Sequence, residues 1–188
     1  MDEKNVLILF GTRYGTTGEI VEKMTEYLKD MNISTENFNL KEINSNEIPK
    51  ISEYGGLIIG TGMKINKWTK YVRNYIKDHQ EMLQNRTNKF GMFTCGAFAI
   101  GQPEKAKEDL KQRLMEDYGL EPDHYEAFGG VLDLSDDSNL GFLDKKMLKV
   151  ASKAMKEEDG VEVKPDARND FRDWEKIKTF TQEFGKLL

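Results

Sequence analysis

The sequence predicts an α/β protein built on a doubly wound, five-stranded parallel sheet with helices on both faces. Short apolar runs alternate with longer segments whose apolar residues recur at helical spacing. These runs are almost continuously apolar, which is typical of parallel strands buried on both faces. An interval of about 35 residues, 135–170, separates the last strand region from the last helix. An interval of that length predicts an insertion with structure or function of its own.

The five strands are expected at the short apolar runs. The second run alternates only weakly between apolar and polar residues, which is typical of an edge strand. The expected strands cover NVLILF (5–10), ISTENFNL (33–40), GGLIIG (55–60), KFGMFTC (89–95) and HYEAFGGVLDL (124–134).

Four helices are expected around these strands because apolar residues recur every three or four positions. Pro103 suits the first turn of the third helix. In the second helix, Trp68 is the first apolar position and His79 lies on the apolar stripe, so both are expected in or beside the core. The marker residues of the four helices span Ile20–Met31, Trp68–Leu83, Ala106–Tyr118 and Trp174–Leu187. We expect residues 1–188 to form one domain with an insertion at about 135–170.

Composition narrows the classes of partner and compartment. The net charge of −5 argues against nucleic acid as the main partner, because phosphate backbones select basic proteins. No segment approaches the roughly 20 apolar residues that span a bilayer, and no signal-peptide core is present, which predicts a cytoplasmic protein. The single cysteine, Cys95, excludes an intrachain disulfide and fits a reducing compartment.

The loop GTRYGTT (11–17) connects the first strand to the first helix and predicts an anion site. In doubly wound sheets ligands bind beyond the carboxyl ends of the strands, where helix N-termini present unpaired N–H groups. Gly11 and Gly15 permit close backbone approach, and Thr12, Thr16 and Thr17 offer hydroxyl groups. Thr17 is also a candidate helix cap. The alternative is a capped helix start that binds nothing. Neither the nucleoside-triphosphate loop nor the dinucleotide glycine fingerprint is present.

Three segments, TRYGTT, EYGGLIIGTGM and KFGMFTCGAF, resemble the flavodoxin fold family, and the resemblance covers essentially the whole chain. It implies FMN as cofactor, held by a phosphate loop of the form [ST]-x-[ST]-G-x-T. Thr12, Gly15 and Thr17 match that form, whereas Tyr14 replaces the second hydroxyl residue, and Arg13 and Thr16 complete the loop. A closer resemblance, through DFRDWEKIKTF (170–180), is to menaquinone-dependent protoporphyrinogen IX dehydrogenases and their flavodoxin-domain relatives.

The resemblance also implies where the flavin ring would lie, between the loops after the third and fourth strands. Electron-carrier flavodoxins sandwich the ring between aromatic residues. Here Met63, Ile65 and Phe98 are available instead, which leaves one side of the ring less enclosed, as a flavin that meets a substrate requires. The expected ring-binding residues are Thr61, Gly62, Met63, Lys64 and Ile65 in the first loop, and Thr94, Cys95, Gly96, Ala97 and Phe98 in the second.

Charge near the ring is expected to be positive. Lys64 and Lys67 follow the third strand, and no acid occurs between residues 60 and 77. Cys95 ends a buried strand and is expected to be a core residue rather than a redox thiol, because a flavin carries two electrons unaided. His124 opens the last strand without a visible partner. No catalytic side chain is assigned, and no metal-ligand spacing occurs.

The insertion contains a basic amphipathic segment, NLGFLDKKMLKVASKAMKEE (139–158). One stripe is apolar: Phe142, Leu143, Met147, Val150, Ala151, Ala154 and Met155. A second stripe carries Lys145, Lys149, Lys153 and Lys156. Two interpretations remain open at this point. The helix either packs on its own domain with solvated lysines, or makes peripheral contact with an anionic membrane or an acidic partner.

These observations favour an FMN-binding oxidoreductase that moves electrons. In one version it oxidises a bulky reduced small molecule such as protoporphyrinogen IX and passes electrons to a quinone. In the other it is a soluble carrier between redox partner proteins. The insertion favours the enzyme, and the acidic composition favours the carrier. A cofactor-free interaction module would require a vestigial phosphate loop. The sequence does not predict the oligomeric state.

Overall fold

The computed structural model describes residues 4–138 and 140–188. Its central sheet has the strand order β2-β1-β3-β5-β6, and every neighbouring pair on that path is parallel. The predicted five-stranded parallel sheet is therefore confirmed. Chain order reverses between β1 and β3, which is where a doubly wound sheet binds its ligand. The strands are β1 (Asn5–Gly11), β2 (Ser34–Asn39), β3 (Gly56–Lys64), β5 (Lys89–Cys95) and β6 (His124–Phe128).

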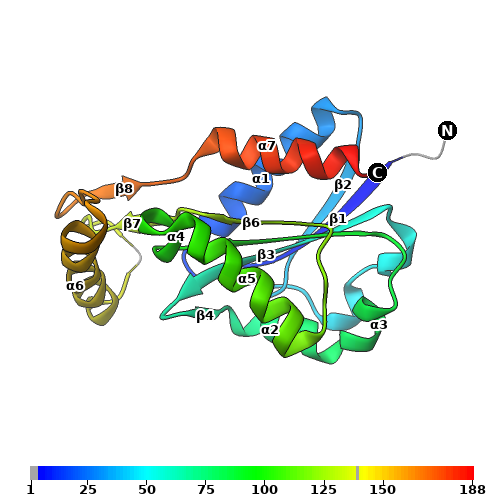
Figure 1. Cartoon of the computed structure of the whole chain (residues 1–188), viewed down its shortest axis with the longest axis horizontal. Helices are drawn as coiled ribbons and strands as arrows, with labels where there is room; N and C mark the ends of the chain where they lie inside the picture. Colours follow the sequence, from blue (N-terminus) through cyan, green and yellow to red (C-terminus); the bar gives the residue numbers. More distant parts are fainter. Residues whose placement is uncertain (1–3, 139) are drawn as a thin grey trace.

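Helices cover both faces of the sheet (Figure 1). One face carries α1 (Thr16–Asp30) and α7 (Trp174–Lys186). The other carries α2 (Lys70–Asp78), α3 (Gln80–Gln84) and α5 (Pro103–Tyr118). Short helices η1 (Ser45–Glu47), η2 (Ile51–Glu53) and α4 (Phe98–Gly101) lie in the connections.

The core explains why the strand runs are continuously apolar. Alternate residues of a strand point to opposite faces, so β1 sends Val6 and Ile8 under α1 and α7 and Leu7 and Leu9 toward α2 and α5. Helix α7 sits close to the sheet because glycines face it. A Cβ atom at Gly56 would lie 2.8 Å from the Phe184 ring, so the bare backbone there makes room for that ring.

The predicted helix from Trp68 begins later than expected. Trp68 belongs to β4 (Lys67–Trp68), which pairs antiparallel with the end of β3, and α2 begins at Lys70. The β3–β4 turn places Ile65 and Asn66 at positive φ, 47° and 55°. The turn contains no glycine, so the usual hairpin signal is missing from the sequence. Trp68 is nevertheless buried, which confirms it as a core residue.

His79 interrupts the second helix, dividing α2 from α3. Its ring stacks on Tyr75 at a centroid distance of 4.4 Å, and the residue is half-buried. The expectation that it lies at the boundary of the core is confirmed.

The last predicted strand, 124–134, is divided in two, and this expectation was wrong in its second half. The chain leaves the sheet at Gly129 and forms β7 (Val131–Asp133), which pairs antiparallel with β8 (Arg168–Asp170). We call the β7–β8 pair and its flanking segments the arm. A Cβ atom at Gly129 would lie 2.3 Å from the Phe171 carbonyl oxygen, so the outgoing and returning segments of the arm are in close backbone contact.

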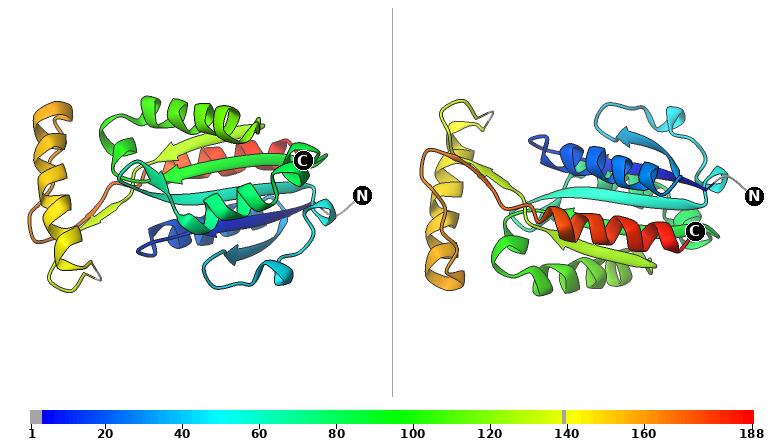
Figure 2. Two further views of the ribbon diagram at one scale, coloured as in Figure 1. Left: turned by 90° about the horizontal axis from the view of Figure 1, so that it is seen from below. Right: turned by 90° about the horizontal axis from the view of Figure 1, so that it is seen from above.

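The arm carries α6 (Phe142–Asp159), which lies crosswise beyond one end of the sheet (Figure 2). The predicted insertion helix therefore exists, although its expected start, Asn139, lies outside the described residues. Its apolar stripe is split between two faces. Met147, Ala151 and Met155 are partly or fully buried, whereas Phe142 and Val150 are exposed. Among the described residues, no helix combines the length and apolar composition needed to cross a bilayer.

Candidate functional site

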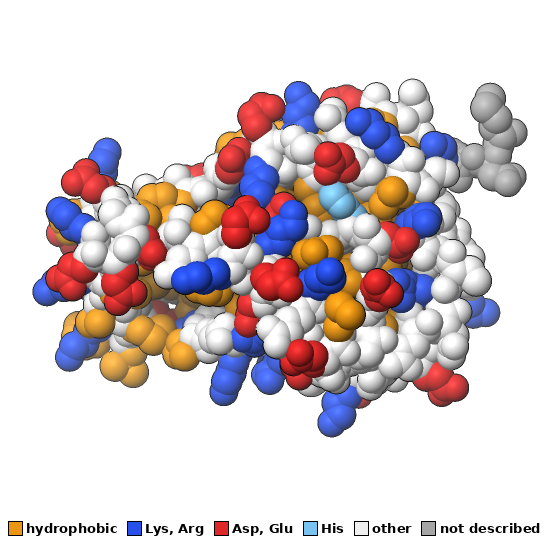
Figure 3. Space-filling model, viewed as in Figure 1, with side chains coloured by type: hydrophobic (Ala, Val, Ile, Leu, Met, Phe, Trp, Pro, Cys, Tyr) orange, Lys and Arg blue, Asp and Glu red, His pale blue; other side chains and the backbone are white. Residues whose placement is uncertain are grey.

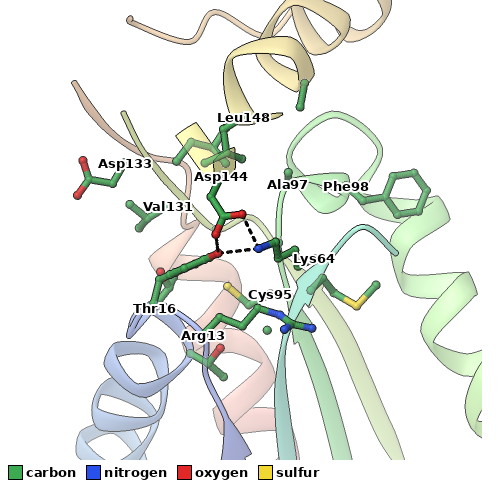
Figure 4. Close-up of a pocket in the computed structure, with 18 of the residues that line it drawn as sticks. Arg13, Thr16, Lys64, Cys95, Ala97, Phe98, Val131, Asp133, Asp144 and Leu148 are labelled. Carbon is green, nitrogen blue, oxygen red and sulfur yellow. Dashed lines mark hydrogen bonds and ion pairs between the residues drawn. The ribbon is translucent and has the colours of Figure 1, made fainter. Parts of the chain in front are cut away.

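A cavity of about 770 Å³ lies between the carboxyl ends of the strands and helix α6 (Figure 4). That volume is typical of a site for a small organic molecule or cofactor. Three loops predicted from the sequence meet in its wall: the loop after β1, the end of β3 and the loop after β5. The predicted residues that line it are Thr12, Arg13, Tyr14, Thr16, Thr17, Gly62, Met63, Lys64, Ile65, Cys95, Gly96, Ala97 and Phe98.

The loop after β1 ends at the start of α1, where Gly15 is the residue before the helix at a φ of 94°. The Gly15 N–H donates to Thr12 Oγ1 at 2.9 Å, which holds the loop in a tight turn. No side chain caps the helix start. The expectation that Thr17 caps α1 was wrong, because the helix already begins at Thr16 and Thr17 lies buried in its first turn.

The residues present at this helix start fit a phosphate group. The first N–H groups of a helix lack intrahelical acceptors, and the helix dipole favours an anion there. Thr12, Thr16 and Thr17 add hydroxyl groups in the cavity wall. The acid of the first turn, Glu19, is paired, because its carboxylate lies 2.5 Å from the guanidinium of Arg172. The ion pair with Arg172 would therefore reduce the repulsion between Glu19 and a bound phosphate.

Arg13 lines the cavity, but its guanidinium is hydrogen-bonded to backbone carbonyl oxygens. It donates to the carbonyl oxygens of Trp68, at 3.1 Å, and Lys67, at 3.4 Å. Arg13 therefore ties the loop after β1 to β4. Lys67 itself does not line the cavity, so the expected second lysine near the ring is displaced by the β3–β4 turn.

Three predicted residues do not line the cavity: Gly15, Thr61 and Thr94. Thr61 is fully buried, and its hydroxyl accepts from the Thr69 N–H at 3.1 Å. Thr94 is buried within β5. In these strands, neighbouring side chains alternate between faces, so a contiguous list of loop residues includes some that point into the core.

Cys95 lies at the base of the cavity as a neutral thiol. Burial raises its pKa to about 12. Its Sγ lies 3.7 Å from the carbonyl oxygen of Gly129, where the chain leaves the sheet. The expectation of a buried cysteine at the end of its strand is confirmed.

Asp144 connects the insertion to the loop after β1 and to the end of β3, a contact that no sequence pattern indicated. Lys64 Nζ lies 2.6 Å from Asp144 Oδ1 and donates to the Tyr14 hydroxyl at 3.0 Å, while that hydroxyl donates to the other oxygen of Asp144 (Figure 4). We call these three residues the latch. They join the loop after β1, the end of β3 and the first turn of α6.

The latch shifts the pKa of each member. Hydrogen bonds from Lys64 and Tyr14 hold the pKa of Asp144 below its usual value. Hydrogen bonding to Asp144 and Tyr14 raises the pKa of Lys64. Partial burial, followed by the bond to Asp144, raises the pKa of Tyr14. The ionised form of the Lys64–Asp144 pair is therefore favoured across the neutral pH range.

The remaining wall comes mainly from the insertion and α5, and its residues were missed. They carry no motif, and only the length of the insertion pointed to them. The additional residues are Glu19, Asn66, Lys105, Asp109, Gly130, Val131, Leu132, Asp133, Ser138, Leu140, Asp144, Met147, Leu148, Ala151 and Arg168.

His124 has two partners in the structure that the sequence did not reveal. Its ring stacks on Phe180 of α7 at a centroid distance of 4.6 Å, and its Nε2 lies 3.4 Å from the Glu183 carboxylate. It lies at the opposite end of β6 from the cavity. Among the described residues, no group of acidic, histidine and cysteine side chains is arranged to hold a metal ion.

Comparison with known protein families decides the classification. The sequence profile of the flavodoxin domain matches residues 7–161. The chain belongs to the flavodoxin-domain family. This membership supports a flavin cofactor and a role in oxidation–reduction or electron transfer, and it confirms the resemblance seen in the three sequence segments.

Individual relatives of the flavodoxin-domain chain agree with this classification. Protoporphyrinogen IX dehydrogenase [quinone] of Escherichia coli (strain K12) is 24% identical over 183 residues, which cover 96% of this chain and 94% of that protein. Oxidised flavodoxin 1 from Bacillus cereus superposes with a TM-score of 0.56 at 12% identity, covering 98% of this chain and 99% of that one.

A larger protein contains a similar fold. Rubredoxin oxygen:oxidoreductase from Desulfovibrio gigas gives a TM-score of 0.58 at 14% identity over 99% of this chain. This chain spans 37% of that protein's length. Similarity at this identity establishes the shared fold, and the fold prediction is confirmed.

Proposed function

We propose that this chain binds FMN in the α6-covered cavity and oxidises a bulky reduced small molecule, such as protoporphyrinogen IX, with a quinone as electron acceptor. The cavity itself carries the proposal. A one-electron carrier needs only an exposed flavin edge, whereas here an inserted helix roofs a cavity of about 770 Å³ that includes the expected phosphate and ring sites. The 24% identical relative, named for its action on protoporphyrinogen IX and a quinone, supports the same chemistry.

The roles of the protein groups follow from their positions. The N–H groups at the start of α1, with Thr12, Thr16 and Thr17, would hold the phosphate. Glycine-rich backbone after β3 and β5 would meet the polar edge of the ring, and Met63 and Phe98 would flank it. Bound FMN supplies the capacity to accept two electrons and pass them on.

Helix α6 would contribute the substrate side of the chamber. Met147, Leu148 and Ala151 turn apolar surface toward the cavity, which excludes water and suits an apolar substrate. In the overall reaction, two electrons and two protons leave the substrate for each quinone reduced to a quinol. We also propose that the protein works in the cytoplasm, with its lipid-dissolved acceptor reached by peripheral contact.

The second candidate is a soluble electron carrier between protein partners. The net charge of −5 favours it, because acidic surfaces suit docking to basic redox proteins. In this case the roof would have no substrate to enclose.

Anaerobic reductive titration of the FMN-loaded protein, followed by turnover assays, separates the two candidates. The enzyme should be reduced directly by two electrons and should oxidise protoporphyrinogen IX with a quinone present. A stable one-electron reduced flavin, with no turnover of that substrate, would instead favour the carrier.

A further inference from the structure

The outward surface of α6 is unusually apolar for an exposed helix. Phe142 is 81% exposed, Leu143 is 78% exposed and Val150 is 65% exposed. At 100° per residue these three side chains share one side of the helix with Lys146 and Lys153, all within an arc of about 100°. We call these five residues the α6 outer face. The side chains that line the cavity come from the opposite side of the helix.

The charge on this helix contrasts with that of the whole chain. Lysines 145, 146, 149, 153 and 156 are interrupted by no acid, although the chain carries a net charge of −5. Lys149 pairs with Asp166 at 3.0 Å and Lys156 with Glu162 at 3.9 Å. Within residues 4–138 and 140–188, no ion pair is found for Lys146 or Lys153.

The position of the helix makes this surface accessible. Helix α6 forms one end of the molecule and lies across it rather than pointing outward (Figure 2). In Figure 3, hydrophobic side chains gather along the lower edge of that end, with basic side chains beside them. Acids begin again at Glu157, one turn beyond Lys153, so the part of α6 without acidic residues is confined to residues 145–156.

We propose that the α6 outer face docks the protein on an anionic lipid bilayer, a surface that would supply the quinone of the proposed function. A helix lying across the end of the molecule can rest in the plane of the interface. Its apolar side chains then enter the boundary layer, and its lysines reach the anionic headgroups. When the protein is docked in this way, α6 lies between the bilayer and the cavity.

A second copy of the chain fits this surface less well. A two-fold contact would place the same residues opposite one another, so Lys146 and Lys153 of one copy would face those of the other. An acidic protein partner would pair with the lysines, but acidic side chains would not explain why the apolar side chains of Phe142 and Leu143 are exposed. A bilayer accommodates both features.

Vesicle cosedimentation of the FMN-loaded protein, residues 1–188, tests the proposal. Binding is expected to vesicles of phosphatidylcholine with 30% phosphatidylglycerol, and it should weaken as salt rises, because salt screens the lysines. The double variant Lys146→Glu/Lys153→Glu should bind at least about tenfold more weakly, since each basic residue near an anionic surface contributes substantially. Phe142→Ser/Leu143→Ser should also bind more weakly at every salt concentration.

A matched control is Lys29→Glu/Lys77→Glu, which makes the same charge change on α1 and α2 and should bind like the wild type. Circular dichroism and bound FMN, measured on every variant, establish that the fold is retained. Equal sedimentation with and without vesicles, equal binding to uncharged vesicles, or dimerisation lost in Phe142→Ser would each overturn the proposal. Vesicle binding by a protein that takes up no FMN would instead contradict the proposed function alone.

Discussion

At the scale of single residues, Lys64 and Asp144 form the contact that most changes the expected chemistry. The sequence places a lysine beside the expected flavin ring with no nearby acid. The structure brings an acid to it from 80 positions away, at 2.6 Å. The positive charge that would favour an anionic reduced flavin is therefore partly neutralised by the insertion.

Opposite substitutions in this pair should shift the flavin potential in opposite directions. At roughly 8 Å and an effective dielectric constant of about 20, one charge contributes on the order of 2 kcal/mol, or about 90 mV for one electron. Exposure reduces this to a few tens of millivolts. Lys64→Glu should lower the potential for the second electron, and Asp144→Asn should raise it, in each case more at low salt. Dye-coupled potentiometric titration measures both.

Lys29→Glu, at the far end of α1, provides the control for net charge alone. If Lys64→Glu leaves the potential unchanged or raises it, Lys64 does not act on the flavin. The charge of Lys64 would then give no support to the enzyme over the carrier.

The phosphate loop is the second feature at this scale. Replacing both Thr12 and Thr17 by alanine should weaken FMN binding by about a hundredfold or more, because each lost hydrogen bond to a charged group contributes roughly 1.5–3 kcal/mol. Fluorescence titration of the apoprotein gives the Kd. Thr25→Ala, which removes a hydroxyl from α1 away from the cavity, should bind FMN normally. An unchanged Kd in the double variant would place the phosphate elsewhere.

At the scale of secondary structure elements, α7 packs on β6 through the histidine that opens the strand. Burial lowers the pKa of His124, and nearby Lys107 adds to that effect, while Glu183 opposes it. The unfolded chain therefore binds the proton more readily. This contribution to stability is present above about pH 6.5 and is lost as the pH falls toward the lowered folded pKa.

The free energy of unfolding should consequently decrease as the pH is lowered from 7 to 5. His124→Phe keeps an aromatic ring against Phe180 and should flatten that part of the profile. Urea unfolding at a series of pH values measures the effect. His79→Phe is the control. A profile that flattens in His79→Phe but not in His124→Phe would contradict the assignment of the pH dependence to His124.

Elements also show how far local sequence pattern determines the structure. The buried runs at Val6–Phe10 and Leu57–Ile59 predicted their strands because both faces of the sheet are covered. The β3–β4 turn at Ile65 and Asn66 was not predictable, because it adopts left-handed backbone without glycine. The division at Gly129 was missed because its cause, the passing backbone of Phe171, lies more than 40 positions away along the sequence.

The candidate site divides in the same way. The loops after β1, β3 and β5 could be predicted because each follows directly from a strand with a recognisable pattern. Asp144, Leu148 and the rest of the α6 wall could not, since no local signal shows which side of an insertion helix faces a cavity. A long-range ion pair such as Lys64–Asp144 depends on the path of the arm, which no single segment specifies.

At the scale of the whole molecule, a flavodoxin-type sheet presents its strand ends to a roof that the insertion supplies (Figure 2). In the proposed function, the sheet and the loops after β1, β3 and β5 would hold the cofactor. The arm and α6 complete the wall of the same cavity. We therefore propose that this cavity holds one FMN per chain.

The most direct test is the identity and amount of the bound cofactor. The protein, purified and then incubated with equal concentrations of FMN and FAD, is separated from free flavin, heated and analysed by chromatography. We expect about one FMN per chain, because the loop offers one phosphate site and lacks the dinucleotide glycines. FAD as the sole bound species, or no flavin retained at all, would contradict it.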